Sequence, residues 1–134
     1  MKRVTGLGGI FFKCQDPGKI KEWYRNHLGI QSDQYGAMFG WRSLENPDEK
    51  GTTVWSPFAD NTTYFSPSEK PYMFNYRVEN LEELLAVLKE EGVQIVGEIE
   101  AYDYGKFGWI MDPEGNKIEL WEPVDEKLTP ETEE

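Results

Sequence analysis

The sequence is poor in cysteine and in basic residues. Cys14 is the one cysteine among 134 residues, so no intrachain disulfide can form and a reducing compartment is favoured. Lys and Arg number 14 against 25 acidic residues, which gives a formal net charge of −11. A chain this acidic is a poor candidate for binding nucleic acid, where basic side chains must neutralise phosphates. The charge suits a cationic ligand, although acidity more often serves solubility alone.

Long apolar runs are also missing. No stretch approaches the roughly 20 apolar residues needed to span a bilayer. Met1, Lys2 and Arg3 open the chain, and no apolar segment with a cleavage site follows them, so the pattern does not indicate a signal peptide. We therefore expect a cytoplasmic protein with no membrane partner. The length is sufficient for one domain with a real core.

An internal repeat is the main positive feature of the sequence. Residues 35–41 resemble residues 104–109 with one residue inserted, and the motif at 55–57 resembles the motif at 121–123. An apolar run, an Asx residue and a helical pattern precede each copy. Repeats are sought first because missing one misassigns the whole fold. Two copies indicate a duplicated module whose halves pack into one core with a cleft between them.

The first half predicts a strand, a helix and further strands. Residues 7–13 are rich in β-forming side chains. Asp16 and Pro17 suit the N-cap and first position of a helix, and Gly29 suits the residue after its end. The apolar residues at helical spacing are Ile20, Trp23, Tyr24 and Leu28. Short strands are expected around 34–38, 39–44 and 52–55.

The second half repeats this order. Residues 72–78 predict a strand, and Asn80 is the expected cap of a helix in which Glu83 completes a capping box. The apolar stripe of this helix is Leu81, Leu84, Leu85 and Leu88. Strands are expected at 93–100, 106–111 and 117–122, with a tight turn at 112–116. Each half therefore reads β-α-β-β-β.

These patterns predict one α+β domain over residues 1–134. Its expected parts are a first βαβββ module at 5–58, a connection at 59–71, a second module at 72–123 and an acidic tail at 124–134.

Two segments resemble a known family. Asp16-Pro17, Trp23-Tyr24 and Leu28-Gly29 resemble its strand–Asp–helix segment, and residues 112–120 resemble its closing Asp-Pro-x-Gly-Asn-x-Ile-Glu-Leu segment. The family is the vicinal oxygen chelate superfamily, which includes glyoxalase I, bleomycin-resistance proteins and extradiol dioxygenases. The resemblance covers about residues 5–123. It implies two curved βαβββ sheets whose inner faces form a cup, helices on the outside, and a homodimer.

The resemblance also indicates where a metal would bind. Metal-dependent members place ligands, usually two His and two Glu, on the first and last strand of each module. The matching positions are Gly9, Thr53, Met73 and Glu119, so one carboxylate remains. Divalent transition metals need several His or carboxylate donors, and the single His27 is expected outside the sheet. We therefore expect no metal and no other cofactor.

Strand alternation predicts which side chains line the cup. The expected aromatic wall is Phe11, Trp41, Trp55, Trp109 and Trp121. The other expected lining residues are Lys13, Thr53, Met73, Asn75, Arg77 and Glu119. Apolar walls with few polar groups are typical of a small-molecule site, and indole rings offer π faces to a planar or cationic ligand.

Several functions fit this cup. One is a binding protein of the bleomycin-resistance type that takes a small aromatic or cationic molecule without a metal. Another is a glyoxalase-like lyase or isomerase, or a dioxygenase-related enzyme, in which Glu119 is a base or a lone metal ligand and Arg77 stabilises an enolate. A third is a scaffold whose tryptophans seal the cup. Glu119 paired with Arg77 or Lys13 would be a structural ion pair.

The missing donors make a direct prediction about metal content. Protein purified without chelators should contain far less than one equivalent of Zn, Ni, Mn or Fe, because one carboxylate cannot hold such an ion tightly. Elemental analysis of untreated protein measures this. A stoichiometric transition metal would contradict the prediction.

Overall fold

A computed structural model describes residues 2–125 and contains seven strands and two helices. The expected acidic tail, from residue 126 onward, lies outside the described residues. In chain order the elements are β1 (Val4–Cys14), α1 (Pro17–Leu28), β2 (Ala37–Arg42), β3 (Lys50–Ala59), β4 (Tyr72–Val78), α2 (Leu81–Glu90), β5 (Ile95–Tyr102), β6 (Gly105–Met111) and β7 (Lys117–Pro123).

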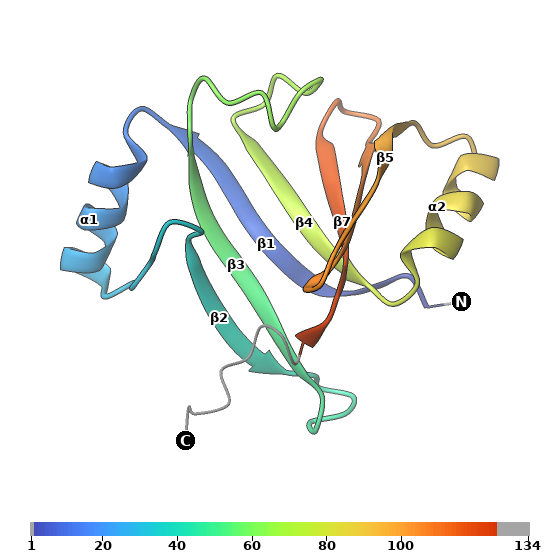
Figure 1. Cartoon of the computed structure of the whole chain (residues 1–134), viewed down its shortest axis with the longest axis horizontal. Helices are drawn as coiled ribbons and strands as arrows, with labels where there is room; N and C mark the ends of the chain where they lie inside the picture. Colours follow the sequence, from blue (N-terminus) through green and yellow to red (C-terminus); the bar gives the residue numbers. More distant parts are fainter. Residues whose placement is uncertain (1, 126–134) are drawn as a thin grey trace.

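The strands form one curved mixed sheet in the order β2-β3-β1-β4-β7-β6-β5 (Figure 1). The two halves of the chain join where β1 pairs antiparallel with β4. Helix α1 packs on β3, and α2 packs on β5, β6 and β7, so the helices lie at opposite ends of the sheet (Figure 1). The α+β class agrees with the expectation from the sequence.

The first half has one strand fewer than expected. Residues 34–44 contain the single strand β2 (Ala37–Arg42) instead of two strands. A tight turn precedes it, because the backbones of Asp33 and Gly36 bond to each other in both directions and Tyr35 N donates to Asp33 Oδ1. Gly36 has φ of 109°, a conformation that glycine adopts readily and that interrupts an extended strand.

The helix ends are capped in different ways. Asp16 Oδ1 accepts from Lys19 N at 3.2 Å, and Gly29 closes α1 with φ of 72°, both as expected. Asn80 makes no side-chain cap at α2, which differs from the expectation. Glu122 on β7 takes this role, since its Oε1 accepts from Leu81 N at 2.9 Å. The start of α2 is thus bonded to the last strand.

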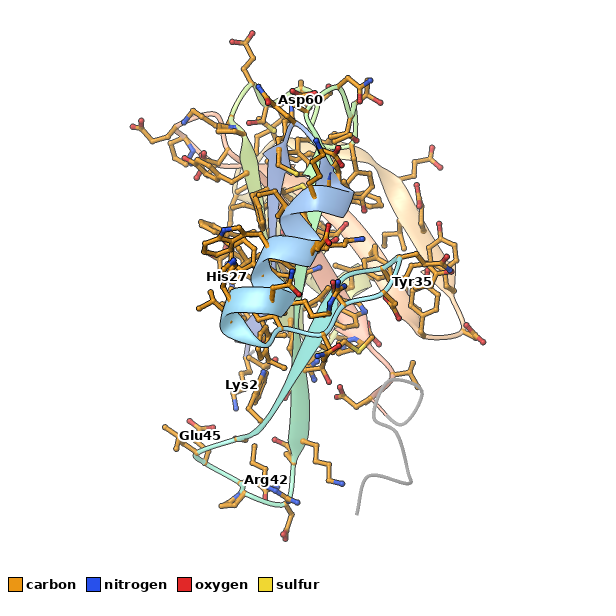
Figure 2. All side chains as sticks on the ribbon, turned by 90° about the vertical axis from the view of Figure 1, so that its left-hand side faces the viewer. Lys2, His27, Tyr35, Arg42, Glu45 and Asp60 are labelled. Carbon is orange, nitrogen blue, oxygen red and sulfur yellow. The ribbon has the colours of Figure 1, made fainter. Side chains whose placement is uncertain are left out.

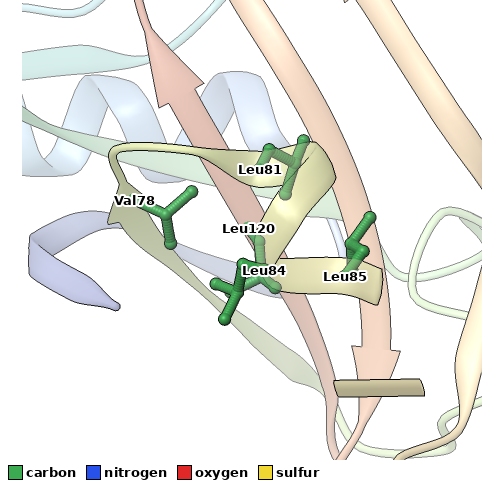
Figure 3. Close-up of a cluster of buried hydrophobic side chains, with 5 residues drawn as sticks. All are labelled: Val78, Leu81, Leu84, Leu85 and Leu120. Carbon is green, nitrogen blue, oxygen red and sulfur yellow. The ribbon is translucent and has the colours of Figure 1, made fainter. Parts of the chain in front are cut away.

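Two apolar clusters hold the sheet and helices together. The first joins α2 to the sheet through Val78, Leu81, Leu84, Leu85 and Leu120 (Figure 3). The second cluster consists of Phe11, Phe65, Met73 and Trp109. Phe65 belongs to the connection between β3 and β4 and is 0% exposed, so it anchors that segment to the sheet. None of the helices in residues 2–125 is long and apolar enough to cross a membrane.

The α2 cluster should dominate stability. Leu81 is 0% exposed, so Leu81→Ala should lower the free energy of unfolding by about 3 kcal/mol through lost burial and a residual cavity. Leu44 is 99% exposed and provides the matched control, because Leu44→Ala should change it by less than about 0.5 kcal/mol. Urea denaturation measures both. Equal effects of the two substitutions would contradict this assignment of the core.

Candidate functional site

The site is built around the carboxylate of Glu119 on β7, which is 2% exposed. Asn75 Nδ2 donates to Oε1 at 2.6 Å, and Trp109 Nε1 donates to Oε2 at 2.9 Å. The hydroxyl of Tyr64 also donates to Oε2. Three donors from three separate segments therefore converge on one carboxylate.

The register of the sheet explains this convergence. Gly9 on β1 lies opposite both Val54 on β3 and Asn75 on β4. Asn75 lies opposite Glu119, and Glu119 lies opposite Trp109 on β6. Directly paired residues present their side chains on the same face of the sheet, so this register brings the side chains of Asn75, Glu119 and Trp109 together. Tyr64 is added from the connection between β3 and β4.

Burial and hydrogen bonding act on Glu119 in opposite directions. Burial raises its pKa above the ordinary glutamate value, because it penalises the charged form, while the bonds from Tyr64, Asn75 and Trp109 favour that form. Burial, together with the nearby Glu119 charge, raises the pKa of Tyr64, so its hydroxyl remains a donor. Burial also lowers the pKa of Lys117, whose Nζ donates to the Tyr64 carbonyl at 2.8 Å.

Glu119 and Asn75 lie at a cavity of about 900 Å³ on the inner face of the sheet. Its aromatic lining comes from both halves of the chain: Phe11, Tyr35, Phe58, Tyr64, Tyr104, Phe107 and Trp121. Asp33 and Glu119 are its acidic residues, and none of the described residues that line it is Lys, Arg or His. We call this space the Glu119 cavity.

Several expected site residues lie at or beneath the Glu119 cavity. Phe11, Asn75, Glu119 and Trp121 line it. Met73 and Trp109 pack below, in the cluster with Phe11 and Phe65. Lys13 extends over the Phe65 ring, with Nζ 5.6 Å from the ring centroid.

The structure reverses the orientation that we expected for β3. Trp55 packs against Tyr24 of α1 and Phe12, on the outer face of the sheet, with ring centroids 4.9 and 5.5 Å away. The cavity instead receives Val54, Ser56 and Phe58 from this strand. The physical reason is the parallel pairing of β3 with β1, which sets Ser56 opposite Phe11. The repeat alignment of Trp55 with Trp121 does not preserve the face.

Trp41, Thr53 and Arg77 gather at a second cavity of about 780 Å³, at the other end of β1. Trp41 Nε1 donates to Thr53 Oγ1 at 2.7 Å, and Thr53 Oγ1 donates to the Leu7 carbonyl at 2.6 Å. The Arg77 guanidinium lies between the Trp41 and Trp121 rings and pairs with Asp125 at 2.6 Å. Arg77 is thus turned away from Glu119, and the two do not form an ion pair.

Tyr64 was missed by the sequence reasoning. It lies in a polar connection that carries no family motif, and only the structure shows its hydroxyl on Glu119. Phe58, stacked on Tyr64 at 5.8 Å between centroids, was missed with it. Tyr35 and Tyr104 carried a signal, because each precedes a glycine in the repeat. Figure 2 shows Tyr35 on the loop that follows α1 and His27 on α1 itself, and of the two only Tyr35 lines the Glu119 cavity.

The donors present do not fit a transition-metal site. The residues in register with Glu119 on β3, β1 and β4 are Val54, Gly9 and Asn75. Their side chains offer a metal ion one neutral amide beside the single carboxylate. Both Glu119 oxygens already accept hydrogen bonds. Within residues 2–125, no three His, Cys, Asp or Glu side chains form a group that could hold a metal ion. The metal-free state stays a prediction for elemental analysis.

Comparison with known proteins identifies the family. The model of the glyoxalase/bleomycin resistance protein/dioxygenase superfamily matches residues 6–120. The chain therefore belongs to this superfamily, as its closing Asp-Pro-x-Gly-Asn-x-Ile-Glu-Leu segment indicated. No curated protein sequence matches the chain.

Solved structures share the fold at low identity. A methylmalonyl-CoA epimerase from Mycobacterium tuberculosis is 20% identical, with a TM-score of 0.58 over 92% of this chain and 91% of the other. The Streptomyces coelicolor methylmalonyl-CoA epimerase in complex with 2-nitronate-propionyl-CoA is 14% identical, with a TM-score of 0.66 over 90% and 99%. A superfamily member from Vibrio splendidus 12B01 is 16% identical, with a TM-score of 0.55 over 87% and 98%. These likenesses extend to the fold alone.

The packing of Asn75 gives a test of the site geometry. A Cβ added at Gly8 would overlap Asn75 Oδ1, so Gly8→Ala should displace the amide and lower the free energy of unfolding by about 2 kcal/mol. Gly40 lies in strand β2 with no atom closer than 4.0 Å to its added Cβ, so Gly40→Ala should not destabilise the protein. Chemical denaturation compares the two variants. Equal stability of Gly8→Ala and wild type would contradict the geometry.

Proposed function

We propose that this protein binds a small aromatic or cationic molecule in the Glu119 cavity without a bound metal. The observation that carries the proposal is the combination of aromatic walls with a buried acidic group and no basic side chain among the described lining residues. Aromatic rings supply apolar contact area and attract a cation to their faces. A few well-placed polar groups then orient the ligand.

The carboxylate is held in place before any ligand arrives. Tyr64, Asn75 and Trp109 each donate to it, so binding requires no rearrangement of Glu119. Preorganisation of this kind lowers the entropic cost of association. The overall charge of −11 adds a long-range attraction for cations, which weakens as salt is added.

The alternative enzymatic role finds less support in this geometry. Glu119 as a base would need a partner that stabilises developing negative charge at the reacting atoms. Arg77 was the candidate, and it lines the other cavity, paired with Asp125.

Two further expectations also stand as proposals. Homodimer formation is supported by the exposed apolar side chains of Leu7, Ile10 and Phe74 on the outer face of β1 and β4. A reducing, cytoplasmic location is supported by the single cysteine, Cys14, which lacks any cysteine to pair with in the chain.

Tryptophan fluorescence tests ligand binding in the cavity. Titration with a panel of small aromatic amines and neutral aromatics should give a saturable change in emission for some members, because Trp121 lines the cavity. Trp121→Phe should abolish most of this change. Trp23 is 51% exposed on α1, away from the cavity, so Trp23→Phe is the control that should retain it. A wild-type protein with no change across the panel would contradict the proposed function.

A further inference from the structure

Asn75 carries a buried oxygen that has no hydrogen-bond partner within the described residues. Its side chain is 1% exposed, and Nδ2 donates to Glu119 Oε1. A carboxylate can only accept hydrogen bonds, so the amide must turn its nitrogen toward Glu119 and its oxygen away from it. An unpartnered buried acceptor of this kind costs about 1–3 kcal/mol, which calls for a functional explanation.

The free oxygen lies beside the Glu119 cavity. Gly8 and Asn75 both line this cavity, and Oδ1 occupies the space that a side chain at position 8 would fill. The missing side chain at Gly8 therefore makes room for the acceptor at the cavity wall. Trp121 Nε1 is also buried and unpartnered, but it packs against Gly105 and takes no part in this site.

Glu119 offers a second acceptor next to the first. Its Oε2 receives two donors, from Tyr64 and Trp109, while its Oε1 receives only Asn75. A carboxylate oxygen has room for two hydrogen bonds. Oε1 lies 2.6 Å from Nδ2 of the same amide group that carries Oδ1, so the two acceptors are neighbours.

Within residues 2–125, no side chain satisfies Asn75 Oδ1. Lys117 is the nearest buried cation along β7, and its Nζ donates to the Tyr64 carbonyl and lies over the Tyr64 and Trp109 rings. None of the described residues that line the cavity is Lys, Arg or His. Two adjacent acceptors, one of them charged, match a cation that carries N–H donors on neighbouring nitrogens.

We infer that the ligand of the Glu119 cavity presents an amidinium or guanidinium group that donates one N–H to Glu119 Oε1 and another to Asn75 Oδ1. The inference rests on the proposed function and defines its ligand class. A planar cation of this class also stacks on aromatic faces, which suits the rings of Phe107 and Trp121 that line the same space.

Three matched probes test the inference on the wild-type protein by isothermal titration calorimetry at neutral pH. Benzamidine has the charge and the paired donors, benzamide has the shape without the charge, and benzyltrimethylammonium has the charge without donors. Benzamidine should bind about 10- to 100-fold more tightly than the other two, which corresponds to one or two charge-assisted hydrogen bonds.

Two substitutions locate the effect. Asn75→Leu and Glu119→Gln should each weaken benzamidine binding by about tenfold or more, and leave benzamide binding within about twofold. Asn26 is exposed on α1, so Asn26→Leu is the matched control and should leave benzamidine binding unchanged. Circular dichroism verifies that each variant is folded, and the wild-type probe series remains decisive if one is not.

Each other outcome has a defined meaning. Equal binding of benzyltrimethylammonium would overturn the inference in favour of cation–π attraction alone, and equal binding of benzamide would show that charge is not recognised. Both results would leave the proposed aromatic binding function standing. Absence of binding by all three probes would overturn the inference. If the fluorescence panel also gave no response, the proposed function would fall with it.

Discussion

The placement of one carboxylate in the interior determines much of this structure. Removing an isolated carboxylate from water is costly, and the fold offsets that cost with a hydroxyl, an amide and an indole aimed at the two oxygens of Glu119. Each donor comes from a different segment, so the site exists only when the sheet is complete. The same three donors occupy hydrogen-bonding capacity on Glu119 that a metal ion would need.

Strand register places most of the groups around Glu119, and few other features are needed. Register across β4, β7 and β6 aligns Asn75, Glu119 and Trp109 on one face. The buried ring of Phe65 anchors the connection that delivers Tyr64. Glycine at position 8 leaves room for the Asn75 amide.

The sequence predicted the fold because the fold rests on local signals. The Asp-Pro cap, the helical stripes and the closing strand are readable without tertiary contacts, and Glu119 occupies a defined position in that strand. Tyr64 was beyond reach, since its role depends on a loop conformation set by the burial of Phe65. Trp55 was assigned to the cavity by repeat alignment, whereas the pairing of β3 with β1 directs it toward α1. Strand face is a property of the whole sheet, and repeat alignment does not determine it.

Carbon-13 NMR of the side-chain carboxyl of Glu119, assigned by comparison with Glu119→Gln, tests the central claim most directly. Because burial outweighs the three hydrogen bonds, we expect its titration midpoint to lie above the ordinary glutamate pKa of about 4.3, with the carboxylate form reached at higher pH. A midpoint at or below the ordinary value would contradict the account, because it would mean that burial does not outweigh the hydrogen bonds from Tyr64, Asn75 and Trp109.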